Sequence, residues 1–176
     1  MADSFKISKL GAAERQLREA IRLVFQDRDP ISVHTLACAA HQILYDISKS
    51  RGLSSNIKDV VPNRKRREWF NILNTSYNFF RHANKDQEME IDFNPTISHF
   101  FILDATFLYQ NLQDKLFYEG ALFRIWFNKR YPEYVLKSGT GDRLLNLMQE
   151  LNSYFSDEDF VEYLELIDKH GLDYVK

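Results

Sequence analysis

A column of polar side chains recurs at helical spacing between residues 67 and 82 of the chain. At about 100° per residue, one side of a helix here carries Arg67, Asn71, Asn74, Asn78 and Arg81, with His82 at its edge. Asparagine is a poor helix former, so a face that only contacts water would more favourably use Glu, Lys or Gln. The pattern therefore indicates that hydrogen bonds to these amides offset their poor helix propensity.

Two interpretations of this column predict different proteins. In the functional one, arginines at both ends of a ladder of amides hold phosphates or sugar edges, and the basic run NRKRRE at residues 63–68 extends the positive patch. In the structural one, the asparagines cross-link neighbouring helices and the arginines are solvated, which the frequency of short basic runs on soluble proteins favours. Because the formal net charge is only -2, affinity for nucleic acid or nucleotide must come from such a local patch.

A second group of chemically capable side chains lies in residues 31–49. His34, Cys38 and His41 fall on one side of this segment, together with Tyr45 and Ser48. Their i,i+4 and i,i+3 spacings suit metal ligands, but the two histidines stand roughly 10 Å apart along a helix axis, too far for one ion. We therefore predict no metal and no cofactor, and we interpret the histidines as hydrogen-bonded core residues.

Asp104 is the third candidate, because it projects among apolar residues such as Phe101 and Leu108. An unpaired carboxylate would be costly there, so we expect a donor partner: His41, His82 or an arginine. A buried Asp–His pair is the minimum for general base chemistry, but it serves equally as a structural brace. Since nothing in the sequence supplies a nucleophile, the brace is the favoured interpretation.

The elements that must position these residues are helices. The chain has only 6 Gly and 4 Pro, and they fall between segments with helical periodicity. This predicts an all-α fold, a single helical bundle of about six or seven helices over residues 1–176. The expected helices cover residues 8–26, 31–49, 63–83 and 95–113, most of 113–134, and two segments after Asp142 and Ser156. The helix that begins at Pro95 is apolar almost all round and should be the central one.

Two stretches between the helices admit other interpretations. In residues 88–93, Met89, Ile91 and Phe93 alternate with acidic residues, which predicts one short strand or an extended loop that packs one side down. This stretch lacks the Gly of a calcium-binding loop. The segment KSGTGD at residues 137–142 has neither the preceding strand nor the following Lys of a phosphate-binding loop.

The composition indicates where the protein works. The 14 Phe, 9 Tyr and 2 Trp predict a thick core, or a core plus a subunit interface, and hence a homodimer. The single Cys38 precludes an internal disulfide and suits a reducing compartment. No stretch has the length of a membrane span or the apolar core of a signal peptide. We therefore expect a cytoplasmic protein without membrane contact.

An all-α chain with an Asn/Arg/His cluster near the end of a long helix resembles the HEPN superfamily of helical nucleotide-binding and ribonuclease domains. The resemblance covers residues 30–110 and includes the phrase NFFRHANKD. It implies a helical bundle, frequent dimerisation and, in active members, metal-independent RNA cleavage by an Arg and a His in the pattern R-x4-6-H. In this chain Asn78 and Arg81 precede His82 in place of that arginine, and the formal match to the pattern is Arg28 with His34.

Together these residues predict a non-enzymatic binding or regulatory module with a nucleotide- or RNA-binding polar face. Its site is expected where the helix end at Arg81 and His82 meets the polar side of residues 31–49. One alternative is a HEPN-type metal-independent ribonuclease or nucleotide-handling enzyme that uses Asn78, Arg81 and His82. Another is a metal-dependent enzyme that uses His34, His41, His82 and Asp104.

Overall fold

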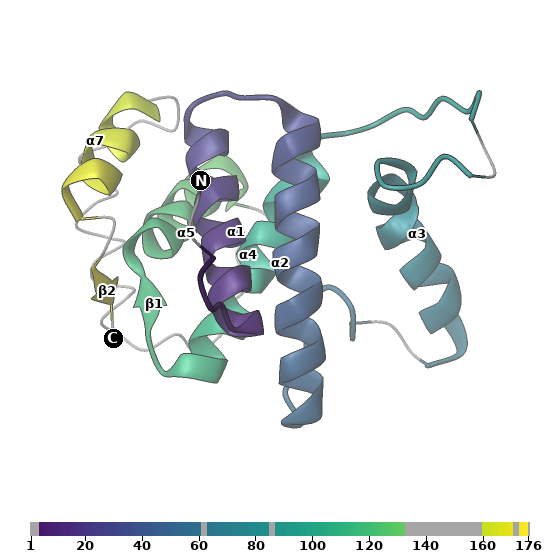
Figure 1. The fold of residues 1–176 in the computed structure, drawn as a ribbon, viewed down its shortest axis with the longest axis horizontal. Coiled ribbons are helices and arrows are strands. Elements are labelled where there is room, and N and C mark those ends of the chain that lie inside the picture. The colour runs from purple at the N-terminus through teal and green to yellow at the C-terminus, as the bar shows by residue number, and fades with distance from the viewer. Residues whose placement is uncertain (1–3, 61–62, 85–86, 133–159, 171–172, 176) are drawn as a thin grey trace.

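The computed structural model describes residues 4–60, 63–84, 87–132, 160–170 and 173–175 of the chain. Within these ranges the protein is all-α, as its sequence predicts: six α-helices and one 3-10 turn make up the regular structure, apart from one pair of two-residue strands (Figure 1). None of the described helices is long and apolar enough to cross a membrane.

The first two helices begin where their capping residues predict. α1 spans Lys9–Phe25 and follows Ser8, whose hydroxyl accepts a 3.0 Å hydrogen bond from an amide of the first turn. α2 spans Pro30–Ser50, and the Asp29 carboxylate accepts a 2.8 Å hydrogen bond from a first-turn amide in the same way. Pro30 occupies the first helical position, where its missing N–H has no intrahelical partner to lose. Both predicted helices are confirmed.

The remaining helices are α3 (Arg66–Phe79), α4 (Thr96–Gln113), α5 (Tyr118–Arg130) and α7 (Phe160–His170), and the 3-10 turn η1 (Asn63–Lys65) precedes α3. α4 is buried on every side along most of its length, as expected for the central helix. The helix predicted after Asp142 and the segment KSGTGD lie outside the described residues.

The helices are arranged around the antiparallel pair of α1 and α2 (Figure 1). α4 and α5 pack against this pair, and α7 contacts both α1 and α5 at one flank. α3 lies at the opposite flank, on the side of α2 that faces away from α1. α3 is therefore a peripheral helix, joined to the bundle mainly through α2.

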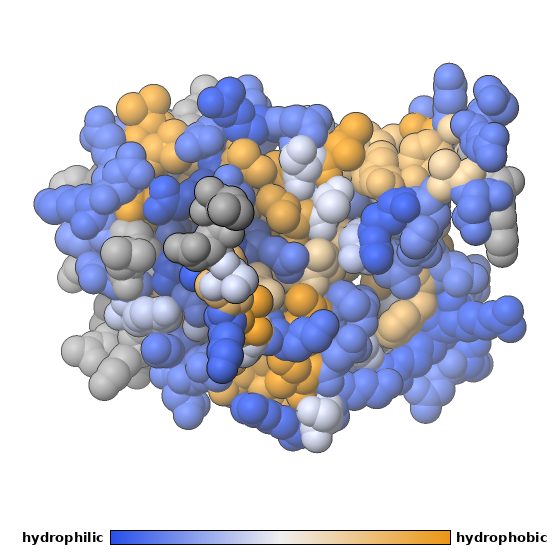
Figure 2. All heavy atoms as spheres, in the orientation of Figure 1, coloured by the Kyte–Doolittle hydropathy of each residue, from blue (hydrophilic) through white to orange (hydrophobic). Residues whose placement is uncertain are grey.

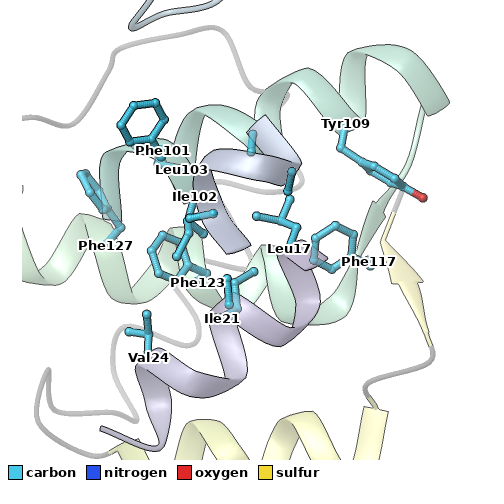
Figure 3. Packing of buried hydrophobic residues seen from close by; sticks show 14 of the residues in the cluster. Leu17, Ile21, Val24, Phe101, Ile102, Leu103, Tyr109, Phe117, Phe123 and Phe127 are labelled. Carbon is cyan, nitrogen blue, oxygen red and sulfur yellow. The ribbon is translucent and has the colours of Figure 1, made fainter. Parts of the chain in front are cut away.

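One cluster of buried apolar side chains joins α1, α2, α4 and α5 and extends to α7. Figure 3 shows Leu17, Ile21 and Val24 along the side of α1 that faces α4 and α5. The aromatic residues contribute much of this core: Phe25, for example, stacks on Tyr163 with ring centroids 5.0 Å apart. The predicted thick core is confirmed, and the homodimer stays a prediction.

A short strand pair corrects the prediction for residues 113–134. α4 ends at Gln113, and the Asp114 that follows has a left-handed φ of 53°. The chain then forms β1 (Leu116–Phe117) before α5 begins. β1 pairs antiparallel with β2 (Tyr174–Val175). Two residues are too few for a recognisable period of alternation, and the partner strand lies far along the chain, so sequence periodicity did not reveal the pair.

The Glu14 carboxylate ties the β2 segment to the bundle. It accepts a 2.6 Å hydrogen bond from the Tyr109 hydroxyl and a 2.8 Å hydrogen bond from the Tyr174 hydroxyl. Arg18, one turn further along α1, donates to the same carboxylate at 3.0 Å. Three separate elements are thus joined at one side chain.

Residues 88–93 form an irregular loop rather than a strand. Ile91 and Phe93 are half-buried, as expected for a loop that packs one side down, and the acidic residues between them are exposed. Met89 departs from the pattern, because 49% of its surface is exposed. The extended-loop alternative therefore describes this stretch, with its apolar packing confined to the end nearest α4.

Candidate functional site

α3 exposes the polar column that its sequence predicts. Arg67, Asn71, Asn78 and Arg81 are exposed, and Asn74 is half-buried. Every residue of α3 is described, and the one buried among them is Leu73. In Figure 2 the surface over α3 is largely hydrophilic. The column is thus an outer face of the molecule, hereafter the α3 face (Arg67, Asn71, Asn74, Asn78 and Arg81).

The amides of the α3 face are not used to hold neighbouring helices. Within the described part of the chain, no hydrogen bond joins the side chain of Asn71, Asn74 or Asn78 to another residue. The structural interpretation of these asparagines requires such cross-links, and the described residues do not supply them. Three residues of poor helix propensity on one helix therefore have no internal compensation.

The arginines around α3 divide into two kinds. Arg66 is half-buried, donates to the Tyr45 hydroxyl at 2.9 Å and forms an ion pair with Asp59, so it holds α3 against the bundle. Arg64 and Arg67 are exposed, and no described carboxylate pairs with them. Arg81 is also exposed and lies over the Tyr77 ring, 4.6 Å from its centroid. The second kind is available to an anionic partner.

The end of α3 meets the polar side of α2, but not through the residues expected there. Phe80 packs edge-on against the His34 ring at 5.8 Å between centroids, and Phe93 packs against the same ring at 5.0 Å. His82 is exposed and forms no described contact with His41 or Asp104. The turn after Phe79 directs Phe80 inward and leaves His82 outside, so His82 does not join His41 and Asp104, as the metal-dependent alternative requires.

In the structure, His41 is the partner of Asp104. The two side chains lie on α4 and α2, are 2% and 0% exposed, and share a 2.7 Å contact between His41 Nε2 and Asp104 Oδ2. The Asp104 carboxylate also accepts a 2.6 Å hydrogen bond from the Ser55 hydroxyl and a 2.8 Å hydrogen bond from the Asn56 amide. A buried carboxylate with three donors meets the requirement that buried charge be paired.

Burial and hydrogen bonding settle the protonation of this pair. Burial lowers the pKa of His41, although the Asp104 carboxylate acts to raise it. Burial would raise the pKa of Asp104, but the hydrogen bonds from His41, Ser55 and Asn56 bring it below its ordinary value. A neutral imidazole thus donates from Nε2 to an ionised carboxylate, and His41 Nδ1 is left as an unprotonated acceptor that has no hydrogen-bond partner among the described residues. The arrangement resembles a general base, but both residues are closed to solvent, so no substrate reaches them.

His34 and Cys38 are buried in the same helix and form no metal centre. His34 Nδ1 lies 3.0 Å from the Ser98 hydroxyl, and burial lowers the pKa of His34 to about 4. Burial raises the pKa of Cys38 to about 12, so the thiol stays protonated. Among the described residues, no three His, Cys, Asp or Glu side chains come close enough to hold an ion. The set His34, His41, His82 and Asp104 is therefore not a metal site.

The loop after α2 supplies residues of this network that the sequence did not identify. Lys58 is 2% exposed, donates to the Gln42 side chain and lies 4.9 Å from the centre of the Tyr45 ring. Ser55 donates to Asp104, while its amide donates to Asp59 at 2.9 Å. The signal available was the run of Ser and Asn at residues 54–56, which is typical of a hydrogen-bonded turn. It does not indicate which helix the turn packs on.

The described part of the chain is thus an all-α bundle with a buried polar brace and one exposed basic, amide-rich helix face. No protein-family model matches this chain, and neither a curated protein nor a solved structure matches it.

Proposed function

We propose that the protein is a non-enzymatic binding module that holds the phosphate–sugar backbone of single-stranded RNA on the α3 face. The observation that carries the proposal is the ladder of amides and guanidinium groups on the α3 face, whose side chains form no hydrogen bond or ion pair within the described part of the chain. Guanidinium groups bind phosphate oxygens through charge-assisted hydrogen bonds. Side-chain amides both donate and accept, which suits ribose hydroxyls and base edges.

The spacing of the α3 face supports an extended ligand rather than a single phosphate. Arg67 and Asn78 are roughly 16 Å apart along the helix axis, and Arg81 follows in the next turn. Arg64 and Lys65, both exposed in η1, continue the positive charge beyond the start of the helix. The Tyr77 ring under Arg81 adds an aromatic group on which a base or the guanidinium can stack.

Fluorescence anisotropy with a short labelled RNA over a series of salt concentrations tests the proposal. The logarithm of the association constant falls with the logarithm of salt concentration by about 0.7 for each phosphate that is neutralised on a single strand. Arg67→Gln and Arg81→Gln should each reduce this slope by about 0.7. Asn71→Ala with Asn78→Ala should weaken binding and leave the slope unchanged.

Arg15→Gln is the matched control, because Arg15 is an exposed arginine of α1, on the other side of α2 from α3. A control that weakens binding as much as Arg67→Gln would show attraction to the whole surface and contradict the proposal. So would the absence of binding at low salt.

The same samples distinguish the ribonuclease alternative. If gel analysis shows the RNA cleaved without added metal, and His82→Ala abolishes that cleavage in a folded protein, the α3 face is instead part of an enzyme. Light scattering of the complex measures its stoichiometry and tests the predicted homodimer.

A further inference from the structure

A pocket of about 270 Å³ opens beside the turn that joins α1 to α2. Its walls come from both of these helices, from the start of α4 and from α5, and are largely apolar: Val24, Pro30, Val33, Pro95 and Trp126. A cavity of roughly 150 Å³ holds a benzene molecule. This pocket therefore has room for a branched or aromatic side chain together with a small polar head group.

Two polar side chains inside the pocket already have partners. Ser98 and His99 of α4 also line it. The Ser98 hydroxyl lies 3.0 Å from His34 Nδ1, and His99 Nδ1 lies 2.8 Å from the Tyr131 hydroxyl. These bonds leave an apolar environment between Val24, Val33 and Trp126, which favours an apolar portion of a ligand.

Asp27 lines the pocket in an unfavourable setting. Its φ of 48° is left-handed, and its amide closes the end of α1 by a 3.1 Å hydrogen bond to the Val24 carbonyl. Glycine is the usual residue at such a position, because an L side chain is strained there. The negative end of the α1 dipole also disfavours a carboxylate. Within the described residues, the exposed Asp27 side chain has no hydrogen bond or ion pair that would compensate.

Arg28 lines the same pocket and likewise has no described partner. The neighbouring Asp29 does not pair with it, because its carboxylate accepts hydrogen bonds from the Ser32 amide at 2.8 Å and the Ser32 hydroxyl at 2.7 Å. Consecutive residues thus present one unpaired carboxylate and one unpaired guanidinium at the pocket. This pair of charges complements a zwitterion.

We propose that the pocket binds a free α-amino acid with a large apolar side chain. The ligand ammonium group pairs with Asp27, the ligand carboxylate pairs with Arg28, and the side chain enters the apolar space beside Val24, Val33 and Trp126. The pocket shares no residue with the α3 face, so the test of amino-acid binding is independent of the test of RNA binding.

Isothermal titration calorimetry with L-phenylalanine and L-leucine tests the assignment on the intact protein. Both amino acids should bind. Phenethylamine, which lacks the carboxylate, and 3-phenylpropionate, which lacks the ammonium group, should each bind at least about tenfold more weakly than L-phenylalanine, since each loses one charge-assisted pair.

Two variants assign the charges. Asp27→Asn should weaken L-phenylalanine binding at least about tenfold and leave 3-phenylpropionate binding unchanged, whereas Arg28→Gln should weaken L-phenylalanine binding and leave phenethylamine binding unchanged. Arg15→Gln is the matched control for loss of an exposed charge. Asp27→Gly is a second variant that removes the carboxylate and relieves the left-handed strain, so binding should fall while the melting temperature rises. If this variant binds L-phenylalanine more weakly while its melting temperature rises, the loss of binding comes from the missing contact with Asp27 and not from unfolding.

The proposal is overturned if neither amino acid binds at millimolar concentration. It is also overturned if 3-phenylpropionate binds as tightly as L-phenylalanine, because the ammonium group then has no role. The proposal is overturned as well if Asp27→Asn and Arg28→Gln bind L-phenylalanine as tightly as the unmodified protein does, because the ligand then binds elsewhere.

Discussion

Acidification should destabilise this protein strongly, because its core holds histidines that must stay neutral. Burial lowers the pKa of His34 to about 4, and burial together with the Arg130 charge lowers the pKa of His99 to about 4. Burial also lowers the pKa of His41, against the opposing effect of Asp104. In the unfolded chain a histidine has a pKa of about 6.5. Below that pH the unfolded state binds more protons than the folded state.

The loss of stability follows by linkage from the pKa of about 4 that His34 and His99 each have in the folded protein. The stabilising contribution of each neutral histidine is complete above pH 6.5 and is lost as the pH falls toward 4. At pH 4.5 the loss is roughly 2–3 kcal/mol for each of His34 and His99, or about 5 kcal/mol together. Burial raises the pKa of Glu119, which opposes the loss over part of this range. Since domains have total stabilities of about 5–15 kcal/mol, the protein should be close to unfolding at pH 4.5.

Urea unfolding followed by circular dichroism at pH 7.5, 5.5 and 4.5 measures this loss. His34→Gln keeps a hydrogen-bonding group near Ser98 and removes the titration, so between pH 7.5 and 4.5 this variant should lose roughly 2–3 kcal/mol less than the unmodified protein. His82→Gln, which replaces an exposed histidine, is the matched control for the substitution itself. Free energies of unfolding that agree within about 1 kcal/mol at pH 7.5 and 4.5 would refute the reasoning.

Three further substitutions test the brace, the attachment of α3 and the α1–α2 turn. Asp104→Asn replaces a carboxylate that accepts three hydrogen bonds by an amide, whose NH₂ group then faces one of the three donors. The free energy of unfolding measured in urea should therefore fall by about 3 kcal/mol. Asp92→Asn, which changes an exposed carboxylate in the loop of residues 88–93, is the control and should cost less than about 0.5 kcal/mol. Leu73→Ala should lower the hydrogen-exchange protection of α3 amides and leave the protection of α1 unchanged, because Leu73 is the buried contact of a peripheral helix; equal loss in both helices would contradict this. Asp27→Gly should raise stability by about 1 kcal/mol, since glycine adopts the left-handed conformation without strain, and a lower melting temperature would count against that account.

Local signals predicted the starts of α1 and α2 well because each of these starts has a local physical cause. Ser8 and the pair Asp29–Pro30 set the starts of α1 and α2 through caps that involve only neighbouring residues. The prediction that Asp104 has a hydrogen-bond donor as its partner also rested on a local signal, because a carboxylate among apolar neighbours needs one. Helical periodicity placed the residues of the α3 face on one side of a helix, but it did not decide between exposure and cross-links to neighbouring helices.

Tertiary placement was beyond these signals. A helical wheel assigns His82 to the edge of the polar column, but α3 ends at Phe79, and the turn that follows sends Phe80 rather than His82 toward His34. The pairing of Asp104 with His41 instead of His82 depends on which helices lie side by side. Likewise, the pocket is lined by both Arg28 and Pro95, which are far apart in the sequence, and no spacing along the chain predicts that they line one pocket.

The Glu14 carboxylate has a consequence for folding kinetics. Its partners Tyr109 and Tyr174 lie 95 and 160 positions away along the chain, so their contacts close large loops and should form after the helix pairs have docked. Interactions that are absent from the folding transition state slow unfolding and leave the folding rate nearly unchanged. Tyr174→Phe should therefore accelerate unfolding in stopped-flow measurements without slowing refolding. The hydrogen bonds at Glu14 thus govern how long the folded state persists rather than how quickly it is reached.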